Sequence, residues 1–274
     1  MSKPLRMLFA ARSCLLDDSS GAAVACRTQL AAMKRRGVAV AALCGGVLDA
    51  GVEVDLTRWL AERGRRVEVV EPSAAGSGSA TDLPKHVRAV DGDLEVTIHL
   101  GAGATPHEPD DAEAADFMRL YEHLLQTHAP DVVVGHGGGR INREVMARAR
   151  ARGIATVFAL HDLAHHDAGP FADVDAVVVP SRFAADFHRE SLGLACHVLP
   201  NLVDADRVRA ERVDPRYVTF VNPSAQKGVY AFARIADELA RRRPDIRCWS
   251  SRRGGPRRPW PRAGRTFGRA GPST

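Results

Sequence analysis

The amino-acid sequence predicts an α/β protein: a Rossmann-like parallel sheet, then an incomplete second α/β domain and a disordered basic tail. Over the first 200 residues, short apolar runs alternate with helical patterns, which is typical of a parallel sheet. One further strand and helix follow, at 218–221 and 227–242. Beyond Ile246 the chain has no Leu, Val or Ile, so it buries too little apolar surface to offset its ordering entropy. We therefore expect domains at 1–205 and 206–246 and a tail at 247–274.

The expected elements of the first domain follow from local patterns in chain order. The run 5–11 is apolar except for Arg6 and predicts the first strand. In 20–36, apolar residues recur at spacings near three, four and seven, as on one face of a helix, and Gly37 ends it. The same reasoning predicts strands at 38–43, 67–70, 87–90, 94–100, 131–135, 156–160, 176–179 and 196–199, and helices at 56–63, 112–128, 141–152 and 182–192.

Three local signals refine this order. Asp91-Gly92 stands between two predicted strands and indicates a hairpin. Ser181 precedes a helix and is expected to cap it, because its hydroxyl accepts from the first backbone N–H groups. The segment 72–84 is rich in Gly, Ser and Ala and predicts a mobile loop.

Charge and cysteine content limit the classes of function. The formal net charge is +5, but 247–274 holds eight arginines and no acidic residue. The rest of the chain then has 30 basic and 33 acidic residues, a net charge of −3. We therefore expect no nucleic-acid partner. The five cysteines are scattered without a CxxC spacing, which indicates reduced thiols in a cytosolic setting.

The hydropathy pattern predicts neither a transmembrane helix nor a secretory signal. No run of about 18 apolar residues occurs. The N-terminal run from Met7 to Ala11 is shorter than the roughly 7–15-residue core of a signal peptide. We expect a cytoplasmic protein. These patterns leave open a peripheral contact with a membrane surface.

In open α/β sheets, ligands bind beyond the carboxyl ends of the strands, and several predicted loops lie there. After the first strand, Ser20-Gly21 stands at a helix start, where free N–H groups favour an anionic or hydroxyl-rich group. After strand 131–135, His136-Gly137 opens a run that contains three consecutive glycines. Such a run loses much chain entropy on folding, and it suits either a tight turn or close approach to a ligand.

A third loop is rich in histidine and aspartate. It begins His161-Asp162, and His165 follows His161 at a spacing of four, which on a helix would place both rings on one face as zinc ligands. No Glu stands beside His161, and the pattern of a third ligand is missing. A polar loop is the alternative to a metal site.

The last candidate is Lys227-Gly228 at the start of the final predicted helix. A lysine at this place is well positioned to hold a diphosphate near the positive end of the helix dipole. A solvated lysine at a helix end is the alternative.

Two segments near the end of the chain carry a family resemblance. They are Val198-Leu199-Pro200-Asn201-Leu202-Val203-Asp204 and Val221-Asn222-Pro223-Ser224-Ala225-Gln226-Lys227-Gly228. A strand that stops at a proline, followed by a strand, a turn and a helix start with Lys-Gly, resembles the crossover between the two domains of retaining GT-B glycosyltransferases. The resemblance is to the GT4-like kind (glycosyltransferase family 4, group 1), and it covers residues 5 to about 243.

This resemblance implies roles for the residues in the loops. His161 would contact the transferred sugar as the catalytic histidine, an interpretation that we place before a polar loop and before a metal site. The donor-binding residues would be Gly21, Lys227 and Gly228. The acceptor and cleft loops would contribute Ser20, His136, Gly137 and Asp162.

The chain also departs from the family pattern. Ser20-Gly21 stands where the family has paired glycines, and Asn222 stands where it often has an arginine. After Lys227 no Gly-rich loop and no pair of glutamates seven residues apart follows. We therefore expect a C-terminally truncated enzyme with little or no transfer activity by itself, and a tail translated out of the ancestral frame.

The expected function is transfer of a sugar, with retention, from a nucleotide-sugar donor to a small-molecule, glycan or lipid acceptor, with no cofactor and no metal. The alternative is a non-catalytic remnant that binds an acceptor or a partner protein. A third hypothesis is an unrelated Rossmann-like nucleotide-binding protein. The sequence disfavours it, because no GxGxxG follows the first strand and no acidic residue ends the second.

Overall fold

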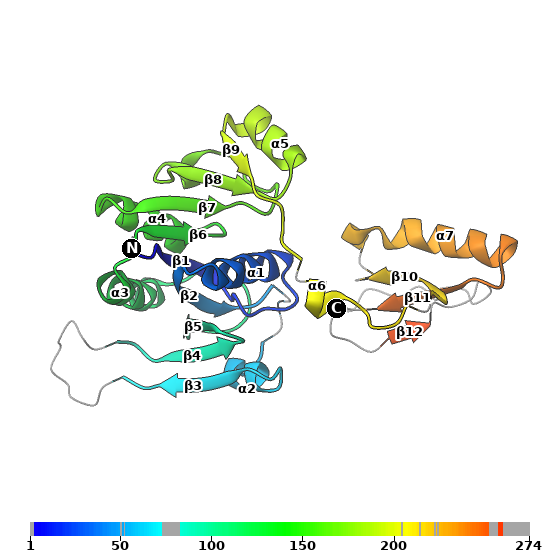
Figure 1. Cartoon of the computed structure of the whole chain (residues 1–274), viewed down its shortest axis with the longest axis horizontal. Coiled ribbons are helices and arrows are strands. Elements are labelled where there is room, and N and C mark those ends of the chain that lie inside the picture. The colour runs from blue at the N-terminus through cyan, green and yellow to red at the C-terminus, as the bar shows by residue number, and fades with distance from the viewer. Residues whose placement is uncertain are drawn as a thin grey trace. The chain divides into compact units, whose positions relative to one another are not determined.

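The computed structural model describes residues 3–49, 51, 53–72, 83–203, 205–213, 215–221, 223, 225–251 and 257–259. The chain forms two compact units, Met1–Asp204 and Ala205–Thr274. Each unit has a sheet of its own (Figure 1). Most of the predicted mobile loop at 72–84 lies outside the described residues.

The first unit is built on a nine-stranded sheet in the order β3-β4-β5-β2-β1-β6-β7-β8-β9. From β5 to β9 all neighbouring strands are parallel. At the other edge, β3 and β4 add two antiparallel pairings. The strands are β1 (Arg6–Ser13), β2 (Ala39–Val47), β3 (Arg66–Val70), β4 (His86–Asp91), β5 (Leu94–His99), β6 (Val132–Gly135), β7 (Ala155–Ala159), β8 (Ala176–Val179) and β9 (Cys196–Val198).

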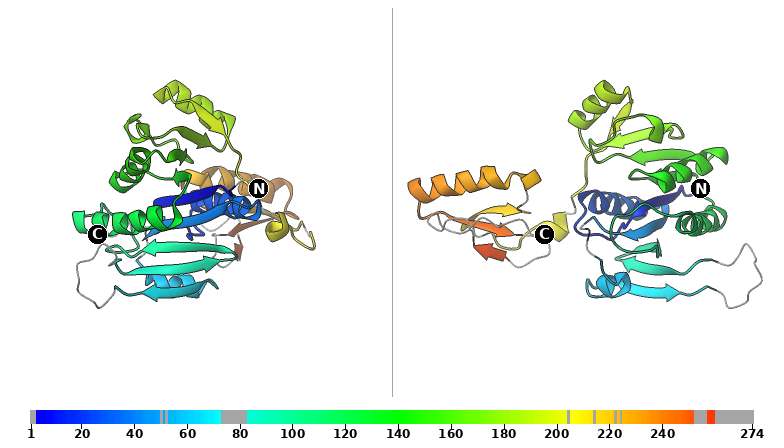
Figure 2. Two further views of the ribbon diagram at one scale, coloured as in Figure 1. Left: turned by 60° about the vertical axis from the view of Figure 1, so that its left-hand side comes forward. Right: turned by 180° about the vertical axis from the view of Figure 1, so that it is seen from behind.

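Helices cover both faces of this sheet, as two further views show (Figure 2). Successive residues of a strand point to opposite faces. On one face, Phe9 and Ala11 of β1 belong to an apolar cluster that also includes residues of α1 and α2. On the other, Leu8 and Ala10 pack with residues of α3 and α4. The helices are α1 (Gly21–Arg35), α2 (Leu56–Ala61), α3 (Asp111–His128), α4 (Arg140–Ala151) and α5 (Arg182–Leu192), with a 3-10 turn η1 (Gly169–Phe171).

The predicted Rossmann-like α/β fold is confirmed, and the expected elements of this unit are present with changes at their ends. The hairpin forms as expected, with Asp91 of β4 opposite Leu94 of β5. Ser181 caps α5, since its Oγ accepts from the backbone N–H of Ala184 at 3.1 Å. Gly37 follows α1 with φ +86°, the left-handed conformation expected after a helix.

The second unit consists of a small sheet and one longer helix. It contains α6 (Ala205–Val208), β10 (Tyr217–Val221), a 3-10 turn η2 (Ala225–Lys227), α7 (Val229–Arg242), β11 (Arg247–Ser251) and β12 (Arg257–Pro259). β10 and β11 are parallel, and β12 pairs antiparallel with β11. Phe220 of β10 stacks on Phe232 of α7 with ring centroids 4.7 Å apart, which joins the helix to one face of the sheet.

The predicted start of the disordered basic tail, at residue 247, lies too early in the chain. Residues 247–251 form β11, and 257–259 form β12, whereas the sequence placed both in a disordered segment. β11 pairs in parallel with β10, and Trp249 packs edge-on against Tyr217 with ring centroids 4.9 Å apart. β11 contains no Leu, Val or Ile. Its backbone pairing with β10 and the packing of one large aromatic side chain, Trp249, stabilise it instead. The rest of the tail lies outside the described residues.

In the described part of the chain, none of the helices has the length and apolar character that a membrane crossing requires. The cytoplasmic location stays a prediction.

Candidate functional site

The loops that follow β1 and β6 flank the point where the sheet changes direction. From β1 the chain passes through α1 to β2 on one side, whereas β6 and the strands after it extend the sheet on the other. Ligands of open α/β sheets bind at such a switch point, beyond the carboxyl ends of the strands. The two loops lie close together: a Cβ atom added to Gly137 would be only 3.8 Å from Oγ of Ser13, at the end of β1.

Ser20 and Gly21 begin α1 and differ in what the fold requires of them. Ser20 is buried and caps the helix, with its Oγ 3.3 Å from the backbone nitrogen of Ala23. Gly21 is exposed, and a Cβ added there would meet no atom within 4 Å. Ser20 thus has a local structural role. The chain itself does not require glycine at position 21, so any such requirement must come from a ligand.

His136 and Gly137 are fixed by contacts with their surroundings. The Nδ1 atom of His136 is 2.9 Å from the carbonyl oxygen of Ala159. A carbonyl only accepts, so Nδ1 is the ring nitrogen that donates in this bond. Gly137 has φ +88°, and a Cβ there would lie 3.0 Å from Nδ2 of Asn142. Gly137 therefore has a structural reason to be glycine whatever its role toward a ligand.

His161 lies just beyond β7 and contacts two other elements. Its Nε2 is 3.5 Å from Sγ of Cys26 in α1, and its ring meets that of His136 edge-on with centroids 5.5 Å apart. Burial raises the pKa of the Cys26 thiol to about 12, so the sulfur stays protonated and is no nucleophile. With Nε2 facing the sulfur, Nδ1 is the ring nitrogen left for a ligand, and no described residue is bonded to it. Sequence reasoning missed Cys26, which it treated only as one of five scattered reduced thiols.

The imidazole of His161 is uncharged at neutral pH. Burial is the main cause, and the neighbouring His136 adds to it; together they lower the pKa of His161 to about 4, although Asp162 acts in the opposite direction. A neutral imidazole offers one hydrogen-bond donor and one acceptor without bringing a positive charge into the site.

The turn after His161 is held by a residue that the sequence did not indicate. The carboxylate of Asp162 accepts from the backbone N–H of Ala164 at 2.9 Å, and the Asp162 side chain itself is exposed. His188 of α5 is fully buried, and its Nε2 donates to the backbone carbonyl of Asp162 at 3.1 Å. A histidine in a helix interior usually indicates packing alone, so no sequence signal pointed to this bond.

The structure does not support the metal interpretation of the His-Asp loop. Residues 161–168 form an irregular loop, so His161 and His165 do not share a helical face. His165 packs edge-on against Phe171, with ring centroids 5.1 Å apart. Among the described residues, no three His, Cys, Asp or Glu side chains gather as metal ligands. The expectation that the protein needs no metal stays a prediction.

In the second unit, Lys227 and Gly228 connect η2 to α7. Lys227 is exposed and ends η2, so the α-helix proper begins slightly later than the sequence predicted. Gly228 is the N-cap of α7 with φ +83°, and its N–H donates to the carbonyl of Ala225 at 3.1 Å. This left-handed conformation favours glycine, so the local backbone explains the residue type at position 228. Asn222 lies outside the described residues.

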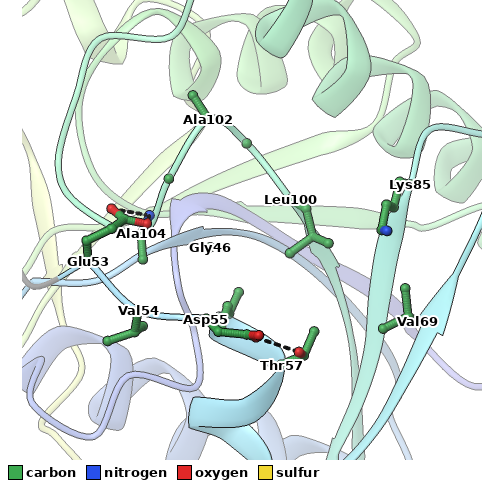
Figure 3. A pocket seen from close by; sticks show the side chains of 13 residues that line it. Gly46, Glu53, Val54, Asp55, Thr57, Val69, Lys85, Leu100, Ala102 and Ala104 are labelled. Atoms are coloured by element: carbon green, nitrogen blue, oxygen red, sulfur yellow. Dashed lines mark hydrogen bonds between the residues drawn. The ribbon is translucent and has the colours of Figure 1, made fainter.

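A pocket of about 400 Å³ lies at the carboxyl ends of β2 and β5 (Figure 3). The loop that follows β5 contributes one wall, with residues 101–104. The other walls come from the start of α2 and from the antiparallel edge of the sheet. The lining residues are Gly46, Glu53, Val54, Asp55, Leu56, Thr57, Val69, Lys85, Leu100, Gly101, Ala102, Gly103 and Ala104.

A doubly wound sheet with polar, glycine-containing loops at its switch point defines a Rossmann-like α/β domain. The profile of Glycosyltransferase Family 4 matches residues 50–207, more than half of the chain, and the chain belongs to this family. The predicted resemblance to GT4-like glycosyltransferases is thereby confirmed. The match contains the loops that begin at His136 and His161, whereas Gly21 and Lys227 lie outside it. No curated protein sequence matches the chain.

Solved structures with a similar fold are distant in sequence. One is an alpha-glucosyltransferase in complex with UDP and a 13-mer DNA containing a HMU base; the identity is 10%, the TM-score 0.46, and the match covers 88% of this chain and 54% of that one. Another is a putative UDP-N-acetylglucosamine 2-epimerase from Listeria monocytogenes, with 8% identity, a TM-score of 0.45, and coverage of 91% and 63%. The chain therefore spans between half and two thirds of the length of these proteins. The expectation of no nucleic-acid partner stays a prediction.

Proposed function

We propose that this chain acts in the transfer of a sugar, with retention, from a nucleotide-sugar donor to a hydroxyl-bearing acceptor. Unit 1 would carry residues for the acceptor, and unit 2 would carry residues for the donor. The observation that carries the proposal is the neutral, partly buried imidazole of His161 at the carboxyl end of β7, in a chain of glycosyltransferase family 4.

The charge state of His161 suits this chemistry. Like glycoside hydrolysis, glycosyl transfer passes through a transition state with positive charge on the sugar ring. A protonated imidazole would repel that charge, whereas a neutral one can accept from or donate to a sugar hydroxyl. Since Nε2 faces Cys26, we assign the sugar contact to Nδ1 of His161.

Donor contacts are assigned in each unit by itself, to Gly21 in unit 1 and to Lys227 in unit 2. The leaving nucleoside diphosphate gains negative charge as the bond to the sugar breaks, and fixed cations or N–H dipoles stabilise it. The exposed ammonium of Lys227 would supply such a cation, and the first N–H groups of α1, next to the unhindered Gly21, would supply the dipoles. We assign Ser20, His136, Gly137, Asp162 and Gly228 to the support of these loops.

Binding of UDP by the full chain, measured by calorimetry, tests the donor assignment. Lys227→Gln should weaken UDP binding about tenfold, because a charge-assisted contact to phosphate is lost. Gly21→Ala should also weaken binding, yet leave the free energy of unfolding unchanged within about 0.5 kcal/mol, because the added methyl meets no protein atom. Lys3→Gln, at an exposed position near the N-terminus, is the control. Absence of UDP binding, or equal binding by the Lys227 variant and the control, would contradict the proposal.

A second experiment tests His161 itself. Incubation with radiolabelled UDP-glucose and UDP-N-acetylglucosamine, with product analysis for transfer and for hydrolysis, should give only a low rate, as expected for this chain by itself, and His161→Gln should abolish it. His166→Gln, at an exposed histidine of the same loop, should retain it. If both variants keep the rate of the unmodified chain, His161 is not the sugar contact.

A further inference from the structure

The pocket at the carboxyl ends of β2 and β5 is separate from the contacts of His161. Adjacent strands lie about 4.8 Å apart, and β5 is four positions from β7 in the sheet, so the two sites are roughly 20 Å apart along its edge. A ligand part held in the pocket cannot touch His161 at the same time. The pocket therefore suits a portion of a molecule that does not itself react.

Carboxylates dominate the polar lining of the pocket. Glu53 accepts from the backbone N–H of Ala104 at 3.0 Å, a bond that lowers the pKa of Glu53. Asp55 accepts through Oδ1 from the hydroxyl of Thr57 at 2.6 Å, and this bond is the main cause of its lowered pKa. Both groups are thus ionised at neutral pH. No described residue is hydrogen-bonded to Oδ2 of Asp55, so this atom can accept from a ligand.

The one cation of the lining does not reverse this balance. Lys85 extends toward the pocket from the opposite side (Figure 3). Its Nζ is 2.7 Å from a carboxylate oxygen of Glu71, which offsets its charge. Val69 and Leu100 lie on the same side and add an apolar surface. The pocket thus combines hydrogen-bond acceptors on one wall with an apolar wall opposite, and it has an excess of negative charge.

We propose that this pocket is a subsite for a hydroxyl-rich, neutral or amino-bearing sugar unit. Hydroxyl or ammonium groups of the ligand would donate to Asp55, and the carbon-bound hydrogens of its ring would pack on Val69 and Leu100. A phosphate or carboxylate would be repelled by the lining. The inference rests on the proposed function only where it names the ligand as the distal part of an extended acceptor. The negative charge of the lining favours a glycan acceptor over a phosphate-bearing lipid.

Titration of the isotopically labelled full chain, followed by NMR, tests the subsite without any donor. The probes are maltotriose, the trisaccharide of glucosamine, and glucose 6-phosphate. Both trisaccharides should shift the resonances of residues 53–57 and 100–104 at millimolar concentration, with the amino form binding more tightly, and glucose 6-phosphate should not.

Two variants, one at each end of α2, make the test specific. Asp55→Asn should weaken the amino trisaccharide about tenfold, because a charge-assisted bond is lost. Asparagine caps a helix as well as aspartate, so α2 should stay intact. Glu62→Gln, at the other end of α2, is the control and should bind like the unmodified chain. Binding of neither trisaccharide, tighter binding of glucose 6-phosphate, or equal affinities of the two variants would overturn the proposal.

This experiment separates the subsite from the proposed function. If UDP fails to bind while the trisaccharides bind with the expected dependence on Asp55, the subsite stands and the transferase assignment fails. If UDP binds and depends on Lys227, but the pocket is empty with all probes, the transferase assignment stands and the subsite fails.

Discussion

Lowering the pH should destabilise the first unit through His161. Burial, with His136 as the second cause, lowers the pKa of this residue from 6.5 to about 4. Since the folded-state pKa lies below the unfolded value, the neutral ring stabilises the fold fully above pH 6.5, and this contribution is lost as the pH falls toward 4. The difference between these two pKa values corresponds to ~3 kcal/mol. The ring is partly exposed, and solvent screening reduces the expected contribution to about 1–2 kcal/mol.

Two measurements check this magnitude. NMR titration of the imidazole protons should give a midpoint near 4 for His161. Urea unfolding of His161→Gln, which has no titrating ring, should lose about 1–2 kcal/mol less stability between pH 7 and 4 than the unmodified chain loses. Burial also lowers the pKa of His99 and His128, and both residues remain in the variant, so the difference isolates His161.

His166→Gln serves as the matched control, because His166 is an exposed residue of the same loop. It should lose as much stability on acidification as the unmodified chain. The reasoning is refuted if His161 titrates near pH 6.5, since burial against Cys26 and His136 would then not hold in solution. It is equally refuted if both variants show the same dependence on pH.

Three further substitutions are each checked by urea unfolding at pH 7. Gly137→Ala should cost about 1–2 kcal/mol, because φ is +88° and the new methyl would press on Asn142; an unchanged midpoint would mean that this turn is not as described. Tyr121→Phe should cost about 1 kcal/mol, because the bond from the buried hydroxyl to the carbonyl of Val145, 2.9 Å long, would be lost. Ser181→Ala should cost about 1 kcal/mol through loss of the α5 cap, whereas Ser181→Asp should keep most of the stability.

The parallel part of the sheet was predictable because each strand there carries its own signal. A buried parallel strand is a short apolar run, and a crossover helix shows the 3.6-residue period, so both are visible in local sequence. The caps at Ser20 and Ser181 are local in the same sense. The strand at 247–251 was missed for the opposite reason. Its stability depends on pairing with β10 and on Trp249 packing against Tyr217, a partner about 30 positions earlier in the chain.

The surroundings of the candidate site could not be predicted, because distant segments build them. The contact of His161 with Cys26 joins positions 135 apart in the sequence, and the bond from His188 to the turn after His161 joins α5 to a loop. The pocket combines α2 with the antiparallel edge strands, which diverge from the simple parallel pattern. Sequence reasoning identifies which loops reach the carboxyl edge of the sheet, but only the folded chain shows which side chains meet there.

The structure also separates the predicted site residues by whether the fold alone explains them. Ser20 caps a helix, and Gly137 and Gly228 adopt left-handed backbone conformations, so selection for folding accounts for these residue types. Gly21 and His161 have no such explanation. An added methyl at Gly21 meets no atom within 4 Å. The partly buried imidazole of His161 is uncharged and has no strong hydrogen-bond partner among the described residues, so it stabilises the fold less than an apolar side chain of similar size would. Under the proposed function these two positions contact a ligand, so substitution at Gly21 and His161 should affect binding or transfer more than stability.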